Sequence, residues 1–267
     1  MKETMEEADW LVPDWPAPAN VHAVCSTRGG GVSEGAWSSL NLGDHVRDDP
    51  RHVTANRAVF AHRLALDGQP ARPVFLQQVH GTRLQWLEPH TPDGVVADAC
   101  AANQPGVACV IMVADCLPVL LCDAAGRAVA AAHAGWRGLA GGVLERTVRE
   151  LSRACDAADG AALHAWLGPC IGATAFEVGA EVKAAFVEND AGAAAHFRPH
   201  GDGKYLADLA ALARTRLAAA GVASLHGNDG SQGWCTVSNP ARFFSYRRDQ
   251  RQLGASGRLA AAIWLGA

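Results

Sequence analysis

Three short apolar runs between residues 107 and 133 constrain the fold more than any other part of this 267-residue sequence. Residues 107–113 and 119–122 are almost entirely apolar, a turn containing Gly126 follows, and residues 128–133 form the third run. Continuous apolar runs of this length are typical of strands that are buried on both faces. We therefore predict a central sheet with further layers packed against it.

Helical and strand patterns alternate in the rest of the chain. Predicted helices cover residues 49–66, 139–154, 177–188 and 206–220, and further strands cover residues 21–27, 74–79, 165–167 and 259–265. The mixture predicts the α/β (mixed α+β) class, with helices covering mixed sheets. Because the sequence shows no internal repeat and no linker, we expect a single domain at residues 21–267, preceded by an irregular, proline-containing arm at residues 1–20.

The composition argues against several classes of partner. Hydrophobic residues make up 49% of the chain and charged residues 19%, and the net charge of −4 gives no electrostatic reason to bind nucleic acid or an anionic membrane. The first residues are acidic and lack the apolar run of a signal peptide, and no segment is long and apolar enough to span a bilayer. We expect a cytoplasmic protein and favour a monomer.

Three residues of metal-binding type share one local pattern. His80, Cys116 and His133 each lie where an apolar run meets a turn that contains glycine or proline. Strand ends fix the backbone while leaving a side chain accessible. Imidazole and thiolate ligands together suit zinc, and three protein ligands leave a fourth position for water or substrate. The pattern therefore indicates an open zinc site.

The residues by themselves leave other interpretations open. Cys116 could instead attack as a thiolate with His133 as its base, and any single His or Cys at a strand end can be structural. The chain has no C-x-x-C motif, so a structural zinc knuckle has no support. Most of its eight cysteines are expected to be small buried hydrophobic residues.

Several arginines and one loop are candidate anion holders. Arg247 and Arg248 follow an aromatic stretch and could hold a phosphate or carboxylate, although an ion pair with Asp249 explains them equally well. Arg57 is a further candidate. The glycine- and proline-containing loop at residues 168–172 could aim backbone N–H groups at an anion.

At this point the motifs resemble those of the laccase-domain family. The matching stretches are Asn-Leu-Gly-Asp at 41–44, Asn-Arg at 56–57, Gln-Val-His-Gly at 78–81, Ala-Asp-Cys-Leu-Pro at 114–118, His-Ala-Gly-Trp-Arg-Gly at 133–138, Gly-Pro-Cys-Ile-Gly at 168–172 with Glu-Val at 177–178, and Phe-Phe-Ser-Tyr-Arg-Arg-Asp at 243–249. Two positions depart from the family pattern: Arg47 replaces a usually small residue, and Ser256 replaces a threonine.

The resemblance implies a fold similar to the catalytic domain of cytotoxic necrotizing factor, with a zinc ion on His80, Cys116 and His133. Members of the family have been described as bacterial polyphenol oxidases, as purine nucleoside phosphorylases with adenosine deaminase activity, and as peptidoglycan editing factors. The resemblance thus implies a zinc-dependent phosphorylase of purine nucleosides (adenosine, inosine, methylthioadenosine) that uses inorganic phosphate and also deaminates adenosine. The substrate-binding candidates are Asn41, Arg57, Glu177, Arg247 and Arg248.

Three alternative functions stay open at this stage. A copper-dependent polyphenol oxidase would place Cu²⁺ on the same ligands, but the other nine histidines are scattered singly, without the close sets that several copper ions need. A peptidoglycan-precursor editing amidohydrolase would use the same zinc site on an amide bond. A metal-stabilised binding protein would have no turnover at all.

Overall fold

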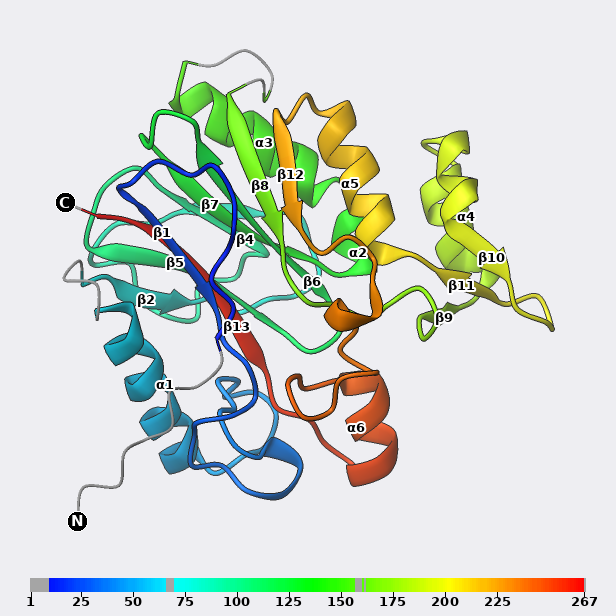
Figure 1. Ribbon diagram of the computed structural model, residues 1–267, viewed down its shortest axis with the longest axis horizontal. Helices are drawn as coiled ribbons and strands as arrows, with labels where there is room; N and C mark the ends of the chain where they lie inside the picture. Colours follow the sequence, from blue (N-terminus) through cyan, green and yellow to red (C-terminus); the bar gives the residue numbers. More distant parts are fainter. Residues whose placement is uncertain (1–9, 66–69, 157–159, 161, 267) are drawn as a thin grey trace.

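Two mixed β-sheets stack face to face between helices in the computed structural model, which describes residues 10–65, 70–156, 160 and 162–266 (Figure 1). The larger sheet has the order β12 (Ser224–Gly227), β8 (Leu163–Leu167), β6 (Leu117–Asp123), β7 (Val129–Ala134), β4 (Ala99–Ala102) and β3 (Leu84–Trp86). The smaller sheet has the order β1 (Val21–Cys25), β13 (Leu259–Leu265), β5 (Val107–Val113) and β2 (Arg72–Phe75). Parallel and antiparallel pairs occur in both sheets, which confirms the predicted mixed class.

Side chains alternate between two apolar layers along the central strands. Cys109 and Ile111 of β5 point into the core between the two sheets, whereas Val110 and Met112 point toward α1 (Pro50–Leu64). In β7, the alternate residues Ala130 and Ala132 face the helices on the other side. Because both faces of each sheet are covered, the strands are apolar throughout, as the three runs of the sequence predict.

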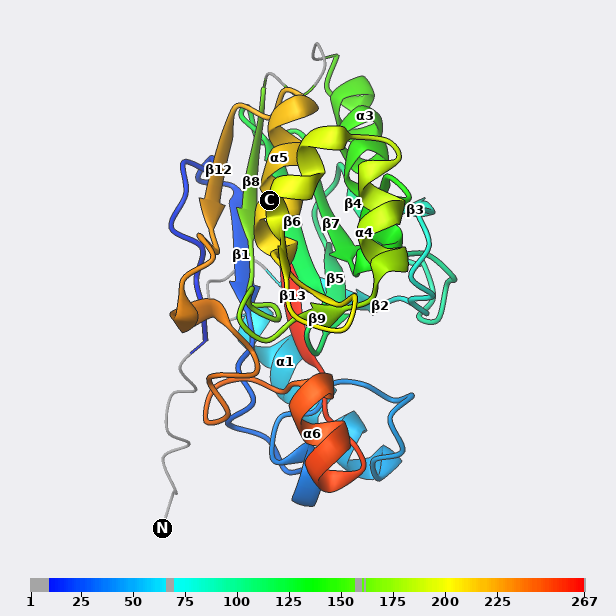
Figure 2. The ribbon, with the colours of Figure 1, turned by 90° about the vertical axis from the view of Figure 1, so that its right-hand side faces the viewer.

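Helices cover the two outer faces of this pair of sheets. The smaller sheet is covered by α1, and the larger one by α2 (Trp136–Ala140), α3 (Val143–Ala154) and α5 (Leu209–Ala219) (Figure 2). Helix α6 (Tyr246–Leu253) lies beyond one end of the sheets (Figure 1), and short 3₁₀ turns occur at Gly35–Trp37, Ala191–His196 and Gln232–Trp234. The result is a four-layer arrangement of helix, sheet, sheet and helix.

Helix α1 begins where the sequence predicts it. The side chain of Asp49 accepts a hydrogen bond from the backbone N–H of Arg51, and Pro50 occupies the first turn, where no N–H is needed. Phe60 is fully buried against the ring of Trp10, at a centroid distance of 5.3 Å. Trp10 of the arm therefore joins the apolar layer between α1 and the smaller sheet.

Four predicted elements differ from the structure. The helix predicted at residues 139–154 is interrupted at Gly141 and Gly142, where Gly142 has a φ of +93°, and its first part belongs to α2. Residues 177–188 begin with strand β9 (Glu177–Val178) before helix α4 (Ala180–Val187).

The other two differences are shifts of a boundary. Leu206 of the predicted helix at residues 206–220 lies in strand β11 (Tyr205–Ala207), and the Asp208 side chain caps the start of α5. Strand β2 ends at Phe75, before the end of the strand predicted at residues 74–79.

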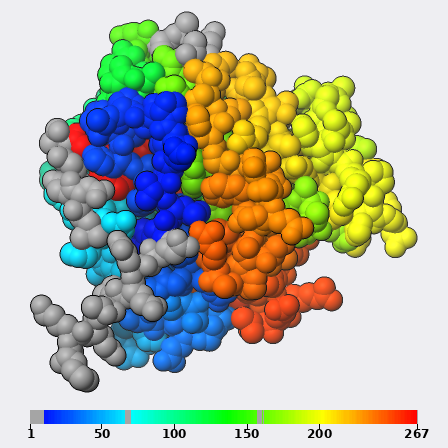
Figure 3. Space-filling view, viewed as in Figure 1, coloured from blue at the N-terminus to red at the C-terminus, as the bar shows by residue number. Residues whose placement is uncertain are grey.

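Helix α4 and a small third sheet form a lobe that stands out from the body (Figure 3). Strand β10 (Phe197–Pro199) pairs with β11, and β11 pairs with β9. Among the described residues, no helix combines the length and apolar character needed to cross a membrane. The cytoplasmic location and the monomeric state stay predictions.

Candidate metal centre

Strand ends bring His80, Cys116 and His133 into one cluster. His133 lies near the end of β7, Cys116 immediately precedes the neighbouring strand β6, and His80 lies in the loop that follows β2. One donor atom of each side chain lies within 4.8 Å of the other two, and Cys116 Sγ is 3.7 Å from His80 Nε2. His133 is buried and His80 is exposed, so the cluster opens to the surface on the His80 side.

A buried carboxylate that the sequence analysis missed holds two of these residues in place. Asp98 Oδ1 accepts hydrogen bonds from His133 Nδ1 at 2.9 Å and from the backbone N–H of His80 at 2.8 Å. Its Oδ2 accepts from the backbone N–H groups of Gly81 at 2.7 Å and Val79 at 3.2 Å. Because a carboxylate only accepts, His133 holds a proton on Nδ1, and Nε2 is the nitrogen that would bind a metal.

One feature of the sequence could have indicated the role of Asp98. It stands alone between the small apolar residues Ala97 and Ala99 at the start of a fully buried strand. An aspartate in such a position needs several donors to offset the loss of its hydration. The sequence does not show which donors these are, because they come from residues 79–81 and from β7.

Two glycines of the stretch at residues 133–138 are needed for close packing. A Cβ atom on Gly135 would lie 2.8 Å from His80 Cδ2 and 2.9 Å from Cys116 Sγ. A Cβ atom on Gly138 would lie 2.8 Å from the carbonyl oxygen of Gly81. Any larger residue at these positions would push the three candidate ligands apart.

Electrostatics favour the charged form of the thiol. Burial opposes ionisation of Cys116, but the positive charge of His133 and the hydrogen bonds from His133 and His80 outweigh it and lower the pKa of the thiol to about 6. Burial also opposes protonation of His133, and the Cys116 thiolate and Asp98 raise its pKa well above the usual value. The cluster thus holds a thiolate at neutral pH, which is the form that binds metals.

Asp115 ties the Cys116 turn to α6. Its φ of +90° lies in the left-handed region, which is uncommon for an aspartate. Asp115 Oδ1 accepts a hydrogen bond from Thr236 Oγ1 at 2.6 Å, and Oδ2 accepts from the backbone N–H of Arg247 at 2.6 Å. The strained turn is thus held by contacts to two distant segments, and it presents Cys116 toward the histidines.

The family model of the multi-copper polyphenol oxidoreductase laccases matches residues 22–266. The chain belongs to this family. The three candidate ligands, Asp98 and both close-packed glycines lie within the matched residues.

Relatives in this laccase family match almost the whole chain. A purine nucleoside phosphorylase of Pseudomonas aeruginosa is 51% identical over 257 residues, which cover 96% of this chain and 98% of that protein. The purine nucleoside phosphorylase YfiH of Escherichia coli is 50% identical over 255 residues, with the same two coverages. The crystal structure of a Neisseria meningitidis protein is similar, with a TM-score of 0.85 and 48% identity, and covers 97% of this chain and 99% of that one.

The donor set fits a metal ion, as the laccase family implies. Two imidazoles and one thiolate are ligands for zinc and also for copper. The ligand atoms are close enough for a single ion to contact all three after small side-chain adjustments. Among the residues that the structure describes, this is the one group of three or more His, Cys, Asp or Glu side chains with such geometry.

Two of the predicted substrate-binding residues have structural contacts instead. The buried Asn41 side chain donates to the Gly43 carbonyl and to Asp48 Oδ2, and it accepts from the backbone N–H groups of Gly43 and Arg258. Arg248 forms the ion pair with Asp249, at 2.7 Å, that the sequence offered as its alternative role. It also donates to the carbonyl oxygens of residues 236, 237 and 243. These contacts engage both side chains within the fold, and their role in substrate binding stays a prediction.

Arg57 is also held by the chain. Its Nε donates to the carbonyl of Leu42, its Nη2 lies 3.2 Å from Asp44 Oδ2, and its guanidinium packs 4.0 Å from the centroid of the Phe75 ring. This geometry favours a structural role for Arg57, in which it stabilises the segment Asn41–Asp44, over a role in binding phosphate.

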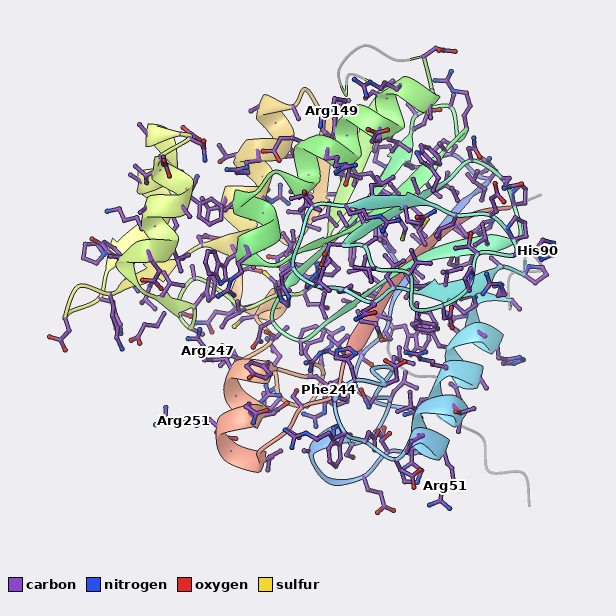
Figure 4. All side chains as sticks on the ribbon, turned by 180° about the vertical axis from the view of Figure 1, so that it is seen from behind. Arg51, His90, Arg149, Phe244, Arg247 and Arg251 are labelled. Carbon is purple, nitrogen blue, oxygen red and sulfur yellow. The ribbon has the colours of Figure 1, made fainter. Side chains whose placement is uncertain are left out.

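Arg247 of α6 lies between that helix and the protruding lobe (Figure 4). Glu177 lies in strand β9 of the lobe, and the two residues form a rim. Arg247 Nη2 donates to the Glu177 carbonyl at 3.1 Å. The Glu177 carboxylate pairs with Lys204 Nζ at 2.7 Å. Because the backbone N–H of Arg247 binds the carboxylate of Asp115, this rim is connected directly to the Cys116 turn.

The loop at residues 168–172 does not aim its N–H groups at an anion, so that hypothesis is wrong. The N–H groups of Gly168, Cys170 and Ile171 donate to backbone carbonyls of residues 118, 234 and 115. The N–H of Gly172 donates to Cys235 Sγ, and Pro169 has no N–H. Since the chain itself uses every donor, the loop serves to fix the Asp115 turn.

Proposed function

We propose that this chain is a zinc-dependent purine nucleoside phosphorylase that also deaminates adenosine. The observation that carries the proposal is near-complete coverage by relatives that are named purine nucleoside phosphorylases and are 50–51% identical to the chain. The accessible His-Cys-His cluster supplies the site. Adenosine, inosine and methylthioadenosine, together with inorganic phosphate, are the proposed substrates.

His80, Cys116 and His133 would hold the zinc ion, and Asp98 would keep His133 in the tautomer that binds it. When it is bound, the ion supplies a Lewis acid beside the substrate. The exposed side of His80 leaves an approach for the nucleoside. Arg247, whose guanidinium lies 5.8 Å from the centroid of the buried Phe176 ring, would provide a planar cationic surface for a purine to stack on.

The rim residues would position the nucleoside while phosphate displaces the base. A phosphate oxygen forms a bond to C1′ of the ribose, the bond from C1′ to the purine nitrogen breaks, and the purine takes the bonding electrons. The rate of this displacement depends on how well the chain orients phosphate and nucleoside. It also depends on how well the chain stabilises the charges that develop on the ribose and the purine. Glu177, which already pairs with Lys204, would contribute a polar contact at the edge of the pocket.

Zinc is favoured over copper by the number of sites. A multi-copper oxidase binds several ions through many histidines, whereas the described residues supply one three-ligand cluster. Metal analysis of protein purified without added copper is expected to give about one zinc per chain. Several copper ions per chain, and oxidation of a polyphenol, would favour the oxidase instead.

The activity is tested with adenosine and phosphate. Zinc-loaded protein is expected to release adenine by phosphorolysis and inosine by deamination, followed by hypoxanthine, as measured by chromatography. Cys116→Ala should abolish all three products. Arg251→Ala, at an exposed position of α6, is the matched control and should keep full activity. If zinc-loaded protein leaves adenosine unchanged, the nucleoside proposal is wrong and the amidohydrolase becomes the next candidate.

A further inference from the structure

A pocket of about 200 Å³ lies between α6 and the segment at residues 43–48. It is lined by His45, Arg47, Tyr246, Gln250, Ser256 and Arg258, among others. None of the described residues that line it carries a carboxylate, whereas two carry a guanidinium. Since a water molecule occupies about 30 Å³ in the liquid, the pocket has room for a group of about six heavy atoms.

Arg258 provides a fixed cation in this pocket. Its backbone N–H donates to Asn41 Oδ1 at 2.9 Å, and its Nη1 donates to the carbonyl oxygens of Ser256 and Gly257, each at 3.0 Å. No Asp or Glu in the described part of the chain forms an ion pair with it, and burial lowers the pKa of the guanidinium. A partly buried cation that forms no ion pair with the described residues, and whose Nε and Nη2 have no hydrogen-bond partner among them, suits an anionic ligand.

Gly43 packs against the Arg258 side chain, and the neighbouring Gly257 packs against Phe244. A Cβ atom on Gly43 would lie 2.7 Å from Arg258 Cγ, so the segment that begins at Asn41 packs directly on the arginine stem. A Cβ atom on Gly257 would lie 2.6 Å from the ring of Phe244. This packing restricts the guanidinium, so less side-chain entropy is lost when it binds a ligand.

Arg47 adds a second cation at the entrance. Its side chain is exposed, and its φ of +64° lies in the left-handed region. His45 also lines the pocket, and its pKa is lowered by burial and by the charge of Arg258.

The pocket adjoins the metal centre. Strand β13 begins at Leu259, directly after Arg258, and Leu259 pairs with Val113, three residues before Cys116. The negative charges of Cys116 and Asp115 act on Arg258. Helix α6, which forms one wall, is anchored to Asp115 through the N–H of Arg247. An anion in the pocket would therefore lie next to the proposed nucleoside site.

We infer that this pocket binds the inorganic phosphate co-substrate, with Arg258 as its principal ligand and Arg47 at the entrance. The inference rests on the proposed phosphorylase function. It also assigns the phosphate to arginines other than those expected from the sequence, because Arg57 and Arg248 are held by the chain's own carboxylates and carbonyls.

Phosphate binding is measured first, without nucleoside, by calorimetric titration of zinc-loaded protein with inorganic phosphate. Arg258→Gln and Arg47→Asn should each raise the Kd for phosphate by about tenfold or more, since each removes a charge-assisted contact. Asparagine is chosen at position 47 because it tolerates a positive φ. Arg251→Ala on the outer side of α6 is the control and should bind like the wild type (Figure 4).

The result that overturns the inference is a wild-type protein that binds no phosphate, or two variants with an unchanged Kd. If Arg258→Gln fails to fold, Arg258→Lys keeps the charge, loses the bidentate geometry and should still weaken binding. Adenosine 5′-monophosphate serves as the second ligand. If it binds more tightly than phosphate, with the same dependence on the two arginines, the pocket belongs to the phosphate of a nucleotide and the co-substrate assignment is wrong.

Turnover separates this inference from the proposed function. Both variants should raise the KM for phosphate while the KM for adenosine changes by less than about twofold, which a merely structural defect would not produce. If the two variants catalyse phosphorolysis with an unchanged KM for phosphate, the assignment of the pocket is wrong and the proposed function is supported. If the variants lose phosphate binding but the wild type consumes no nucleoside, the pocket stands and the function falls.

Discussion

A single buried carboxylate organises the metal centre at the scale of the residue. Asp98 accepts four hydrogen bonds, one from His133 and three from the backbone around His80, and they lower its pKa overall although burial opposes its charge. The same group therefore sets the tautomer of one candidate ligand and the backbone position of another. Such supporting contacts commonly change metal affinity strongly.

Replacing Asp98 tests this role. Asp98→Asn keeps the shape but places an NH₂ group where one of the four donors now points, so we expect zinc affinity to fall by about 10- to 100-fold. Competition with a chromogenic chelator measures the change. Asp229→Asn is the control, because Asp229 also accepts a backbone hydrogen bond but is exposed. Equal zinc affinity in the two variants would contradict the proposed role.

The thiol of Cys116 gives a prediction for pH dependence. Because its pKa is lowered to about 6, metal-free protein should be alkylated by iodoacetamide at a rate that rises through pH 6 and then levels off. Below that pH the thiol is protonated and the rate is lost. Cys25 and Cys122 should stay unreactive in the same sample, since burial raises the pKa of each to about 12.

Mass spectrometry identifies the alkylated residue at each pH. Cys116→Ser should remove the fast reaction. A midpoint near that of an ordinary cysteine, about 8.5, would show that the neighbouring histidines do not stabilise the thiolate.

At the scale of the element, backbone turns rather than apolar patterns decide where helices end. The apolar residues at positions 139–151 continue one helical pattern, yet α2 and α3 are separate because Gly142 adopts a φ of +93°. The break lets α2 follow directly from β7, so that Gly135 and Gly138 pack against the ligands. The short helix is thus part of the site.

Gly142→Ala should destabilise the protein by about 1–2 kcal/mol, because a Cβ atom is unfavourable in the left-handed region. Urea denaturation followed by circular dichroism measures the loss. Gly233→Ala is the control, since that glycine has no positive φ and a Cβ atom there meets nothing within 4 Å. If both variants are equally stable, the conformation at position 142 imposes no cost on alanine.

At the scale of the whole molecule, the candidate ligands join segments that are far apart in sequence. His80 follows a strand of the smaller sheet, whereas Cys116 and His133 lie at the ends of β6 and β7, the two central strands of the larger one. A bound ion would therefore link the two sheets where they meet. Binding only to the folded state raises stability by an amount set by ion concentration and affinity.

Removing the metal should lower the melting temperature. At a zinc concentration about 1,000 times Kd, binding raises the free energy of unfolding by about 4 kcal/mol. In a domain of this size that change corresponds to a shift of roughly 10 °C in the melting temperature. Differential scanning fluorimetry with and without chelator measures the shift, and added zinc should reverse it. Cys116→Ala should show little response to chelator. An unchanged melting temperature in zinc-loaded wild type would show that the ion does not link the sheets.

Much of the fold followed from local patterns. The strand at residues 259–265 was predicted with its observed bounds, and the alternation of β5 between two cores explains why its apolar run is unbroken. The candidate ligands were found because each follows an apolar run. Helix ends were less predictable, since one φ angle at Gly142 outweighs several apolar residues.

The sequence by itself determined the class of fold, the three candidate ligands and the family, because strand hydrophobicity and short motifs are local properties of the chain. Only the tertiary structure decided which polar groups serve the site. Asp98 gains its donors from distant segments, Arg248 forms an ion pair with Asp249, and Arg258 forms no ion pair within the described part of the chain. Hydrogen bonding and charge pairing depend on neighbours in space, and packing brings those neighbours from remote parts of the sequence.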